Sequence, residues 1–326
     1  ELYPQNLQNA IAERQDDGRI TIYNPLTETG DCNDITLWNE ARNYFEREAQ
    51  LTAKAGAAFD RNGKREKQNA PDVLQVEGPL SDIHGNVYLV VDTYQGESLR
   101  AFIERGFVKG EEGTVLSNQH LFELLDVLIK TTSRLSHLHG DCKMYHLDLS
   151  PDNIYLVKAA GGTTLEPHII DYGSAYEYHP NDPCCAVEHR YTCNLHSAPE
   201  VLALAELQDP DCGYHVDPSS DTYSLVSILF YAVTGRIFSP ALRMYDSEWK
   251  EQIHSAYSTG LPAGQNSFAG ELISFFTQGL ASDQQDRFPS AKALCDKLRS
   301  LKRQYQAFGN LLPLVEPEIV PVGATI

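Results

Sequence analysis

The stretch Tyr145-His-Leu-Asp-Leu-Ser-Pro-Asp-Asn-Ile-Tyr-Leu156 decides the fold of this chain. It follows a long amphipathic segment and passes from turn-forming residues into an apolar, β-branched run. Because Asp, Ser, Pro and Asn are common in turns, the stretch taken alone predicts an ordinary turn that leads into a strand. Its chemical interest lies in Asp148 and Asn153, which put a carboxylate and an amide on one short loop.

Four further short motifs follow this loop. The apolar pair Ile169-Ile170 precedes the first of them, and Gly161-Gly162 predicts a hairpin turn between the loop and that pair. One short motif arises easily by chance, whereas five in this order and at these spacings very rarely do. The four are Asp171-Tyr172-Gly173, Ala198-Pro199-Glu200, the segment that starts at Asp221, and Asp286-Arg287-Phe288-Pro289-Ser290.

In this order the five motifs resemble those of the eukaryotic-type protein kinase family. They look like its catalytic loop, its Asp-Phe-Gly and Ala-Pro-Glu motifs, the Asp that opens the central helix, and the late Arg that pairs with the Glu of Ala-Pro-Glu. The resemblance covers about residues 37 to 308. The Ser-Pro-Asp-Asn form of the loop is more similar to a bacterial subgroup of Ser/Thr kinases than to animal kinases.

The resemblance implies an α+β, two-lobed fold, with a small β-rich lobe that is truncated at its start and a larger, mostly α-helical lobe. We expect the partial N-terminal lobe over 1–97, the C-terminal lobe over 98–310, and a proline-containing linker or tail over 311–326. In the first lobe, the residue patterns predict strands at 20–23 and 86–91 and a helix over about 37–51.

Helical periodicity dominates the chain after Ser98. Ser117 is expected to cap an amphipathic helix that ends at Gly140, because its leucines recur at three, four and seven residues. Asp221 is expected to open a helix over 222–234 that is apolar almost all round and therefore central. A last helix is expected to be capped by Ser290.

Phosphoryl transfer needs position and countercharge more than covalent help, and this defines the roles that the resemblance implies. Asp148 would accept the proton of the substrate hydroxyl or orient that hydroxyl. Asn153 and Asp171 would hold Mg²⁺ against the phosphates of ATP, since hard oxygen ligands suit this ion. The expected cofactors are therefore ATP and Mg²⁺.

Four further residues are expected to act structurally. His146 is interpreted as a buried scaffold residue that bonds backbone near Asp171, because Asp148 already fills the role of base. Asp221 is expected to hold the backbone of the catalytic loop. Glu200 and Arg287 are expected to form a buried ion pair.

In the first lobe, the helix that contains Glu48 resembles the one whose Glu pairs with the ATP-contacting Lys; the alternative is an ordinary solvated helix face. Backbone groups of Asp92, Thr93 and Tyr94 resemble the hinge that contacts adenine.

The sequence departs from the family pattern in the parts that bind phosphate. No lysine precedes Lys54, and no G-x-G-x-x-G occurs anywhere. One explanation is a pseudokinase that acts as a nucleotide- or protein-binding scaffold. The other is a chain cut just after the lysine, since Glu1-Leu2-Tyr3-Pro4 resembles the usual continuation; this explanation is the one favoured.

Smaller departures concern the catalytic loop and the activation segment. Leu147 and Ser150 stand where the family usually has Arg and Lys. Thr192 and Cys193 compete for the position of the Thr that contacts the catalytic Asp. A small-molecule kinase of the aminoglycoside or choline type shares the D-x-x-x-x-N loop, but such enzymes usually lack the Ala-Pro-Glu segment.

Composition limits the partners. With 326 residues, 42% of them hydrophobic, the chain is long enough for a two-lobed domain, and a net charge of −19 argues against nucleic acid or an anionic membrane surface. Seven cysteines without framework spacing favour free thiols in a reducing compartment, so we expect a cytoplasmic protein. The sequence predicts no membrane segment and no signal peptide. The expected partners are ATP and a protein, either substrate or binding partner.

Overall fold

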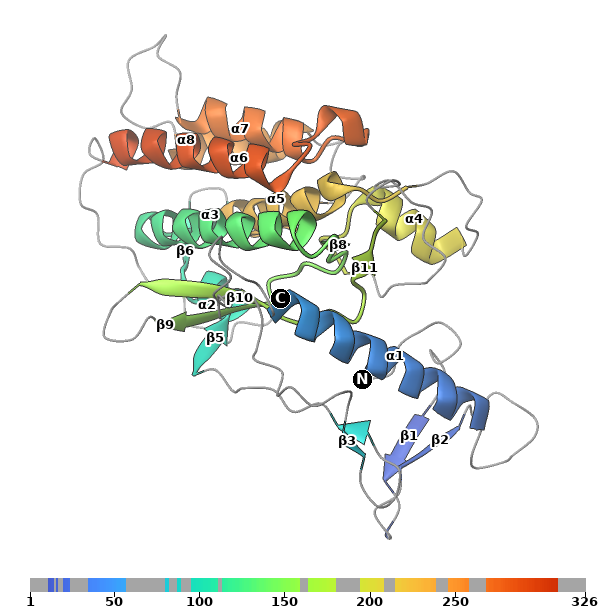
Figure 1. Ribbon diagram of the computed structural model, residues 1–326. Coiled ribbons are helices and arrows are strands. Elements are labelled where there is room, and N and C mark those ends of the chain that lie inside the picture. Colours follow the sequence, from blue (N-terminus) through green and yellow to red (C-terminus); the bar gives the residue numbers. More distant parts are fainter. Residues whose placement is uncertain are drawn as a thin grey trace, which may run out of the picture.

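The computed structural model describes residues 11–14, 16, 20–23, 35–56, 80–81, 87–88, 95–110, 113–158, 164–179, 194–207, 215–238, 246–257 and 268–309. A smaller part of the molecule holds the first strands and one long helix, and a larger part is built mainly from helices (Figure 1). The smaller part consists of β1 (Ile11–Arg14), β2 (Ile20–Tyr23), α1 (Ile35–Gly56), β3 (Leu80–Ser81) and β4 (Val87–Tyr88).

The larger part begins with strands and helices that alternate and ends with helices alone. The alternating elements are β5 (Gly96–Ser98), α2 (Leu99–Arg105), β6 (Phe107–Gly110), β7 (Gly113–Leu116), α3 (Asn118–Gly140), β8 (Met144–Tyr145), β9 (Ile154–Lys158), β10 (Leu165–Ile169) and β11 (Tyr176–Glu177). The helices that follow are α4 (Pro199–Leu207), α5 (Pro218–Thr234), α6 (Asp246–Tyr257), α7 (Phe268–Gly279), the short 3₁₀ turn η3 (Gln284–Asp286) and α8 (Ala291–Gly309).

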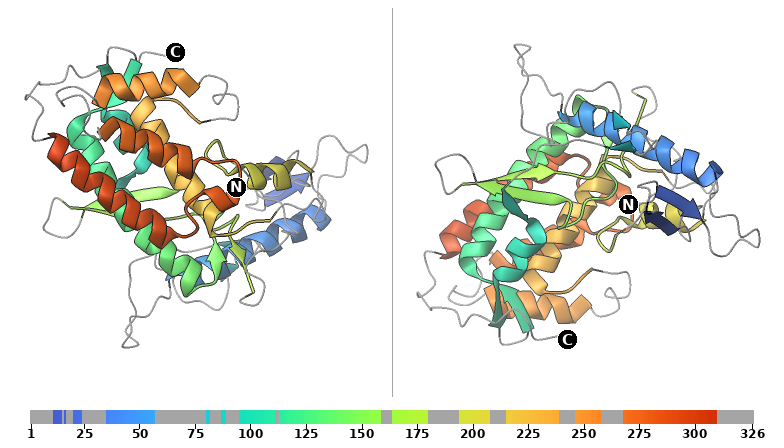
Figure 2. Two further views of the ribbon diagram at one scale, coloured as in Figure 1. Left: turned by 90° about the horizontal axis from the view of Figure 1, so that it is seen from above. Right: turned by 90° about the horizontal axis from the view of Figure 1, so that it is seen from below.

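The amphipathic helix predicted after Ser117 is confirmed as α3. The Ser117 side chain accepts a hydrogen bond from the backbone of His120, which satisfies a donor at the helix start. Figure 2 shows α3 lying side by side with α8, the predicted last helix, which follows Ser290. The leucines on the apolar face of α3 are buried, and burial of each stabilises the fold by roughly 2 kcal/mol. They are Leu121, Leu124, Leu125, Leu128, Leu135 and Leu138.

The central helix α5 begins earlier than the sequence analysis predicted. Asp217 caps it by accepting a hydrogen bond from the Ser219 backbone at 2.7 Å, and Pro218 occupies the first turn, where its missing N–H costs nothing. Asp221 therefore lies within the first turn instead of opening the helix. The predicted end at Gly235 is confirmed, since this glycine has a φ of 66° and closes the helix in the left-handed conformation.

A three-stranded antiparallel sheet, ordered β10-β9-β5, lies below α3. Strands β9 and β10 form the predicted hairpin, although the turn residues Gly161 and Gly162 lie outside the described residues. Strand β5 approaches β9 so closely that a Cβ at Gly96 would lie 2.0 Å from the carbonyl oxygen of Leu156. Only glycine fits there.

The predictions for the first lobe agree with the elements that can be described. The strand over residues 20–23 is β2, which pairs with β1, and the helix predicted over about 37–51 is α1. Of the strand predicted over 86–91, the structure describes β4, and the other residues of that range lie outside the described part. Among the helices that the structure describes, none is both long and apolar enough to span a bilayer.

The structure brings Glu200, at the start of α4, together with Arg287, which follows η3. The guanidinium donates two parallel hydrogen bonds to the carboxylate, at 2.8 and 2.9 Å, and the arginine is 2% exposed. Ser220 of α5 donates to the same carboxylate at 2.6 Å, and Arg287 also donates to the carbonyls of Ala281 and Ser282. One buried charge pair thus joins three segments of the larger part.

Replacing Arg287 with Ala should lower the free energy of unfolding by roughly 3–5 kcal/mol, because Glu200 would keep a buried charge without its countercharge. Urea unfolding followed by circular dichroism measures this. The matched control is Arg299→Ala on α8, whose pairing with Asp296 is exposed and should contribute about 1 kcal/mol or less. Equal losses in the two variants would contradict a structural role for the buried pair.

Candidate active site

The loop between β8 and β9 is held by one carboxylate. Asp221, fully buried in the first turn of α5, accepts hydrogen bonds from the backbone N–H groups of His146 and Leu147, each at 2.8 Å. His139 of α3 contacts the same carboxylate at 2.8 Å. Burial alone would raise the pKa of Asp221, but the hydrogen bond from His139 and the electrostatic attraction of that ring outweigh it, so the pKa lies below its usual value.

This carboxylate matters because the loop backbone is strained. Leu147 has a φ of 63°, in the left-handed region that side chains other than glycine rarely adopt. The bond from its N–H to Asp221 holds that conformation. The next residue is Asp148, whose carboxylate contacts the side-chain amides of Asn153 and Asn194.

His146 lies beneath the loop as a buried connector. Its Nε2 lies 3.1 Å from the carbonyl oxygen of Ile170, and its Nδ1 accepts the backbone N–H of Asp148 at 3.3 Å. The ring packs against Tyr172, with ring centroids 5.2 Å apart. His146 therefore ties the loop to the segment that contains Asp171.

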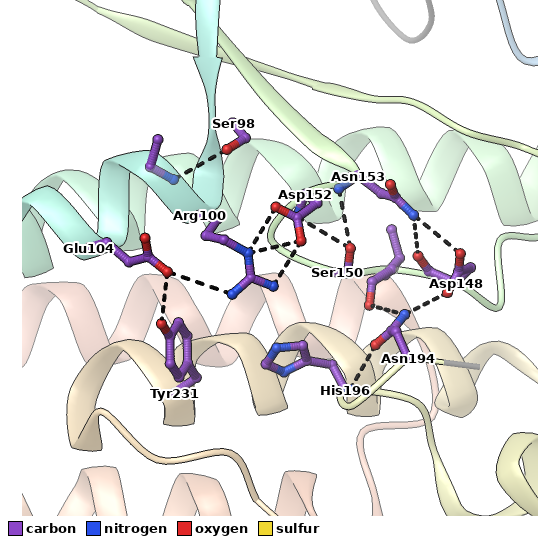
Figure 3. Close-up of polar contacts among 12 residues, drawn as sticks. Ser98, Arg100, Glu104, Asp148, Ser150, Asp152, Asn153, Asn194, His196 and Tyr231 are labelled. Carbon is purple, nitrogen blue, oxygen red and sulfur yellow. Dashed lines mark hydrogen bonds and ion pairs between the residues drawn. The ribbon is translucent and has the colours of Figure 1, made fainter. Parts of the chain in front are cut away.

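Asp148 is surrounded by amide donors (Figure 3). Its Oδ1 accepts from the side-chain nitrogen of Asn194 at 2.6 Å, and its Oδ2 accepts from that of Asn153 at 3.3 Å. Burial, to which the charge of Asp171 adds, raises the pKa of Asp148 to about 6, although Asn194, His146 and Asn153 act in the opposite direction. The carboxylate is ionised at neutral pH and poised to accept a hydrogen bond or a proton.

Asn153 and Asp171 come together through the backbone. The N–H of Ile170 donates to the carbonyl of Asn153 at 3.0 Å, so Asp171 follows directly after a residue bonded to Asn153. Asp171 has a φ of 63°, and its Oδ1 accepts the N–H of Gly173 at 3.2 Å. Ser150, where the family usually has Lys, caps the intervening turn by accepting from the backbone of Asn153 at 3.3 Å.

The donor set of these two residues fits Mg²⁺. The amide nitrogen of Asn153 is committed to the carbonyl and carboxylate of Asp148, so its amide oxygen is the atom it offers to a cation. Asp171 offers carboxylate oxygen. In the described part of the chain no three His, Cys, Asp or Glu side chains form a metal cluster. One amide and one carboxylate match Mg²⁺, which keeps waters and uses phosphate oxygens as its other ligands.

Helix α1 lies against the segment that follows Asp171. A Cβ placed on Gly173 would be 3.7 Å from Oε2 of Glu48, so the Glu48 carboxylate lies beside the turn of this motif. Arg47 donates to the carbonyl of Ala175 at 2.8 Å. Lys54, the earliest lysine in the sequence, forms an ion pair with Glu177 on β11, away from Glu48.

Three residues predicted to contact adenine, Asp92, Thr93 and Tyr94, lie outside the described residues, as do Thr192 and Cys193. Asn194, the next residue along the chain, donates its side-chain amide to Asp148 in the structure. The sequence analysis did not single out this residue. The signal available in the sequence was the Asn-Leu-His-Ser turn, since asparagine favours such turns.

Asn194 is fixed at both ends of its side-chain amide. The amide oxygen accepts the N–H of His196 at 2.7 Å, and the amide nitrogen donates to Asp148; the backbone N–H of Asn194 donates to the hydroxyl of Ser197 at 3.0 Å. His196 is buried, with Nδ1 3.0 Å from the hydroxyl of Ser227 on α5. The segment before α4 is thus attached both to the carboxylate of Asp148 and to the central helix.

Sequence comparison identifies the family of this chain. A family model described as Protein kinase domain matches residues 64–298, which is more than half of the chain. Ribosomal protein S6 kinase alpha-4 of Mus musculus is 28% identical over 171 residues, and that of Homo sapiens is 27% identical over 175 residues. Both matches cover 52% of this chain but 19% of the relative, so the chain spans about a fifth of the length of these proteins.

Among solved structures, the kinase domain of Mycobacterium tuberculosis PknI, in a Cys-to-Ala variant, matches with 17% identity over 79% of both chains and a TM-score of 0.44. The family match shows that the chain belongs to the protein kinase family. The predicted α+β, two-lobed kinase-like fold is confirmed, with the small sheet-containing part and the larger helical part described above.

The buried His196 predicts loss of stability in mild acid. Burial, with the charge of Arg100, lowers the pKa of His196 to about 4 from its ordinary 6.5. The unfolded chain then binds the proton more tightly, so the free energy of unfolding falls as the pH drops from about 6.5 to 4, by on the order of 2 kcal/mol. Urea titrations at several pH values measure this.

His196→Gln should flatten part of that slope, because the variant has no group to protonate at this position. His254→Gln, on the exposed side of α6, is the control and should leave the slope as in the wild type. A slope that is the same in His196→Gln and in the wild type would contradict the assignment.

Proposed function

We propose that this chain transfers the γ-phosphoryl group of ATP, with Mg²⁺, to serine or threonine hydroxyls of proteins. The observation that supports this best is the arrangement of Asp148, Asn153 and Asp171: the amide of Asn153 donates to the Asp148 carboxylate, the backbone carbonyl of Asn153 binds the residue before Asp171, and the charge of Asp171 acts on Asp148. Membership of the protein kinase family supports transfer to protein. The Ser-Pro-Asp-Asn loop, similar to that of bacterial Ser/Thr kinases, supports the choice of hydroxyl.

In this proposal Asp148 orients the acceptor hydroxyl and takes its proton as the oxygen attacks the γ-phosphorus, while the bond to the bridging oxygen breaks and ADP leaves. Asn194 and Asn153 hold the two carboxylate oxygens at fixed positions. The carboxylate is therefore already oriented before the reaction, and little conformational freedom has to be lost when it occurs. Asn153 and Asp171 would hold Mg²⁺, which supplies countercharge for the phosphates when bound. Burial around the loop excludes water from the carboxylate.

Other roles belong to the same proposal. Glu48 is proposed to orient the nucleotide side of the site, and the backbone of residues 92–94 to contact adenine. Residues 1–97 are proposed as N-terminal lobe, 98–310 as C-terminal lobe and 311–326 as linker. The absence of a lysine before Lys54 and of a G-x-G-x-x-G motif is the feature that would favour a binding scaffold, and the next experiment decides between the two.

Asp148→Asn should reduce phosphate transfer to a serine-containing protein or peptide by roughly 10²–10⁴-fold, because the amide cannot accept the proton. Radiolabelled ATP with Ser, Thr and Tyr acceptors measures both rate and acceptor choice. Asp141→Asn, an exposed carboxylate at the end of α3, is the control and should retain the wild-type rate. Full activity in Asp148→Asn would refute the assignment, and absence of transfer by a protein that extends upstream of Glu1 would favour the scaffold.

Asn194→Ala should lower kcat by roughly tenfold to a hundredfold and leave the KM for ATP unchanged, because it loosens Asp148 without touching the nucleotide side. Asn194→Asp should be more damaging, since it keeps the acceptor for His196 but sets a second carboxylate against Asp148. Steady-state kinetics of both variants measure this. An Asp variant as active as the wild type would show that the 2.6 Å contact has no part in catalysis.

A further inference from the structure

An ion-pair network lies beside the catalytic loop, on the first turns of α2 (Figure 3). Nε of Arg100 donates to both carboxylate oxygens of Asp152, at 2.8 and 2.9 Å, and its Nη2 lies 2.8 Å from Oδ2. Its Nη1 lies 3.7 Å from Glu104, whose carboxylate also accepts the hydroxyl of Tyr231 at 3.3 Å. One guanidinium is therefore shared by two carboxylates.

This network lies on the surface next to Asp148. Asp152 directly precedes Asn153 on the catalytic loop, and the backbone N–H of Arg100 donates to the carbonyl of Pro151 at 3.0 Å. The side chains of Arg100 and Asp152 are 37% and 55% exposed, so solvent and a bound peptide can reach both. On the other flank, Asn194 binds Asp148, and its neighbour Leu195 is 70% exposed.

A peptide that presents a hydroxyl to Asp148 must lie across this surface. An exposed carboxylate so close to the base would attract a basic side chain of that peptide. Here the carboxylate of Asp152 is already bound, in the bidentate geometry that guanidinium and carboxylate prefer, by an arginine of the same chain. A substrate cation would have to displace Arg100, and the other flank offers it an apolar side chain.

We propose that Arg100 is a specificity-determining residue: by occupying Asp152 it removes selection for basic side chains beside the acceptor, so the chain binds peptides with basic and with uncharged residues there about equally well. This inference rests on the proposed function, because it assumes a peptide substrate. Specificity is the difference between the affinities for two kinds of peptide, here those with a basic residue and those with an uncharged residue beside the acceptor. Arg100 sets that difference because it competes with the basic residue for the carboxylate of Asp152.

The test compares fluorescein-labelled peptides binding to the full chain, measured by fluorescence anisotropy. In one peptide a serine is flanked by alanine and glycine; in each of the others, arginine replaces one of the three residues on either side of the serine. Wild type should bind all of these peptides with similar affinity. Arg100→Gln frees Asp152, while Glu104 still accepts the Tyr231 hydroxyl, and should favour at least one arginine peptide by roughly fivefold, the size of one partly exposed ion pair.

Two further variants make the result specific. Arg100→Gln combined with Asp152→Asn should return the ratio of affinities to about one, because the freed carboxylate is gone. Arg105 lies on the same helix as Arg100 and pairs with Glu97 of β5. Arg105→Gln breaks that pair and should leave the ratio at the wild-type value. The proposal is overturned by an unchanged ratio in Arg100→Gln, by an equal change in Arg105→Gln, or by failure of Arg100→Gln to bind any arginine peptide.

Phosphate transfer from ATP to the uncharged peptide is measured in parallel with the wild-type chain. Transfer together with an unchanged ratio overturns the role of Arg100 alone. A shifted ratio without any transfer supports the role of Arg100 in peptide binding and counts against the proposed phosphoryl transfer. The two ideas therefore fail separately.

Discussion

The site depends on the carboxylate of Asp221. It accepts two consecutive backbone N–H groups, of His146 and Leu147, at a point where the chain adopts a left-handed conformation that costs roughly 1–2 kcal/mol. Buried hydrogen bonds to a charged acceptor offset that cost. Because α5 is buried almost all round, the carboxylate has no room to move, and the loop inherits the rigidity of the core.

From that anchor, polar contacts spread to segments far apart in the sequence. His146 reaches the backbone before Asp171, and Asn153 and Asn194 reach Asp148 from opposite sides. The segment before α4 is therefore bonded to the carboxylate of Asp148 itself. A change in that segment would alter the position of the carboxylate, because one amide joins the two.

The sequence predicted what depends on local pattern and missed what depends on distant packing. Helix α3 followed from its leucine spacing and from the cap Ser117, whereas the start of α5 was misplaced because Asp217 was overlooked in favour of Asp221. Strands β8 and β11 are two residues long each and have no periodic signal. Asn194 meets Asp148 across 46 residues of chain, so only the folded segment could reveal the contact. The pairing of Glu200 with Arg287 was predicted from the order of the motifs along the chain, because no periodic pattern links residues 87 positions apart.

The hydrogen bond that Arg47 of α1 donates to Ala175 has an evolutionary consequence. Its acceptor is the main-chain carbonyl of Ala175, which every residue type supplies, so this hydrogen bond puts no demand on the side chain at position 175. Position 47 has no such freedom, because few side chains match the reach and the donors of arginine. The bond therefore constrains the residue type at position 47 alone, whereas position 175 is constrained by packing, since Ala175 is fully buried.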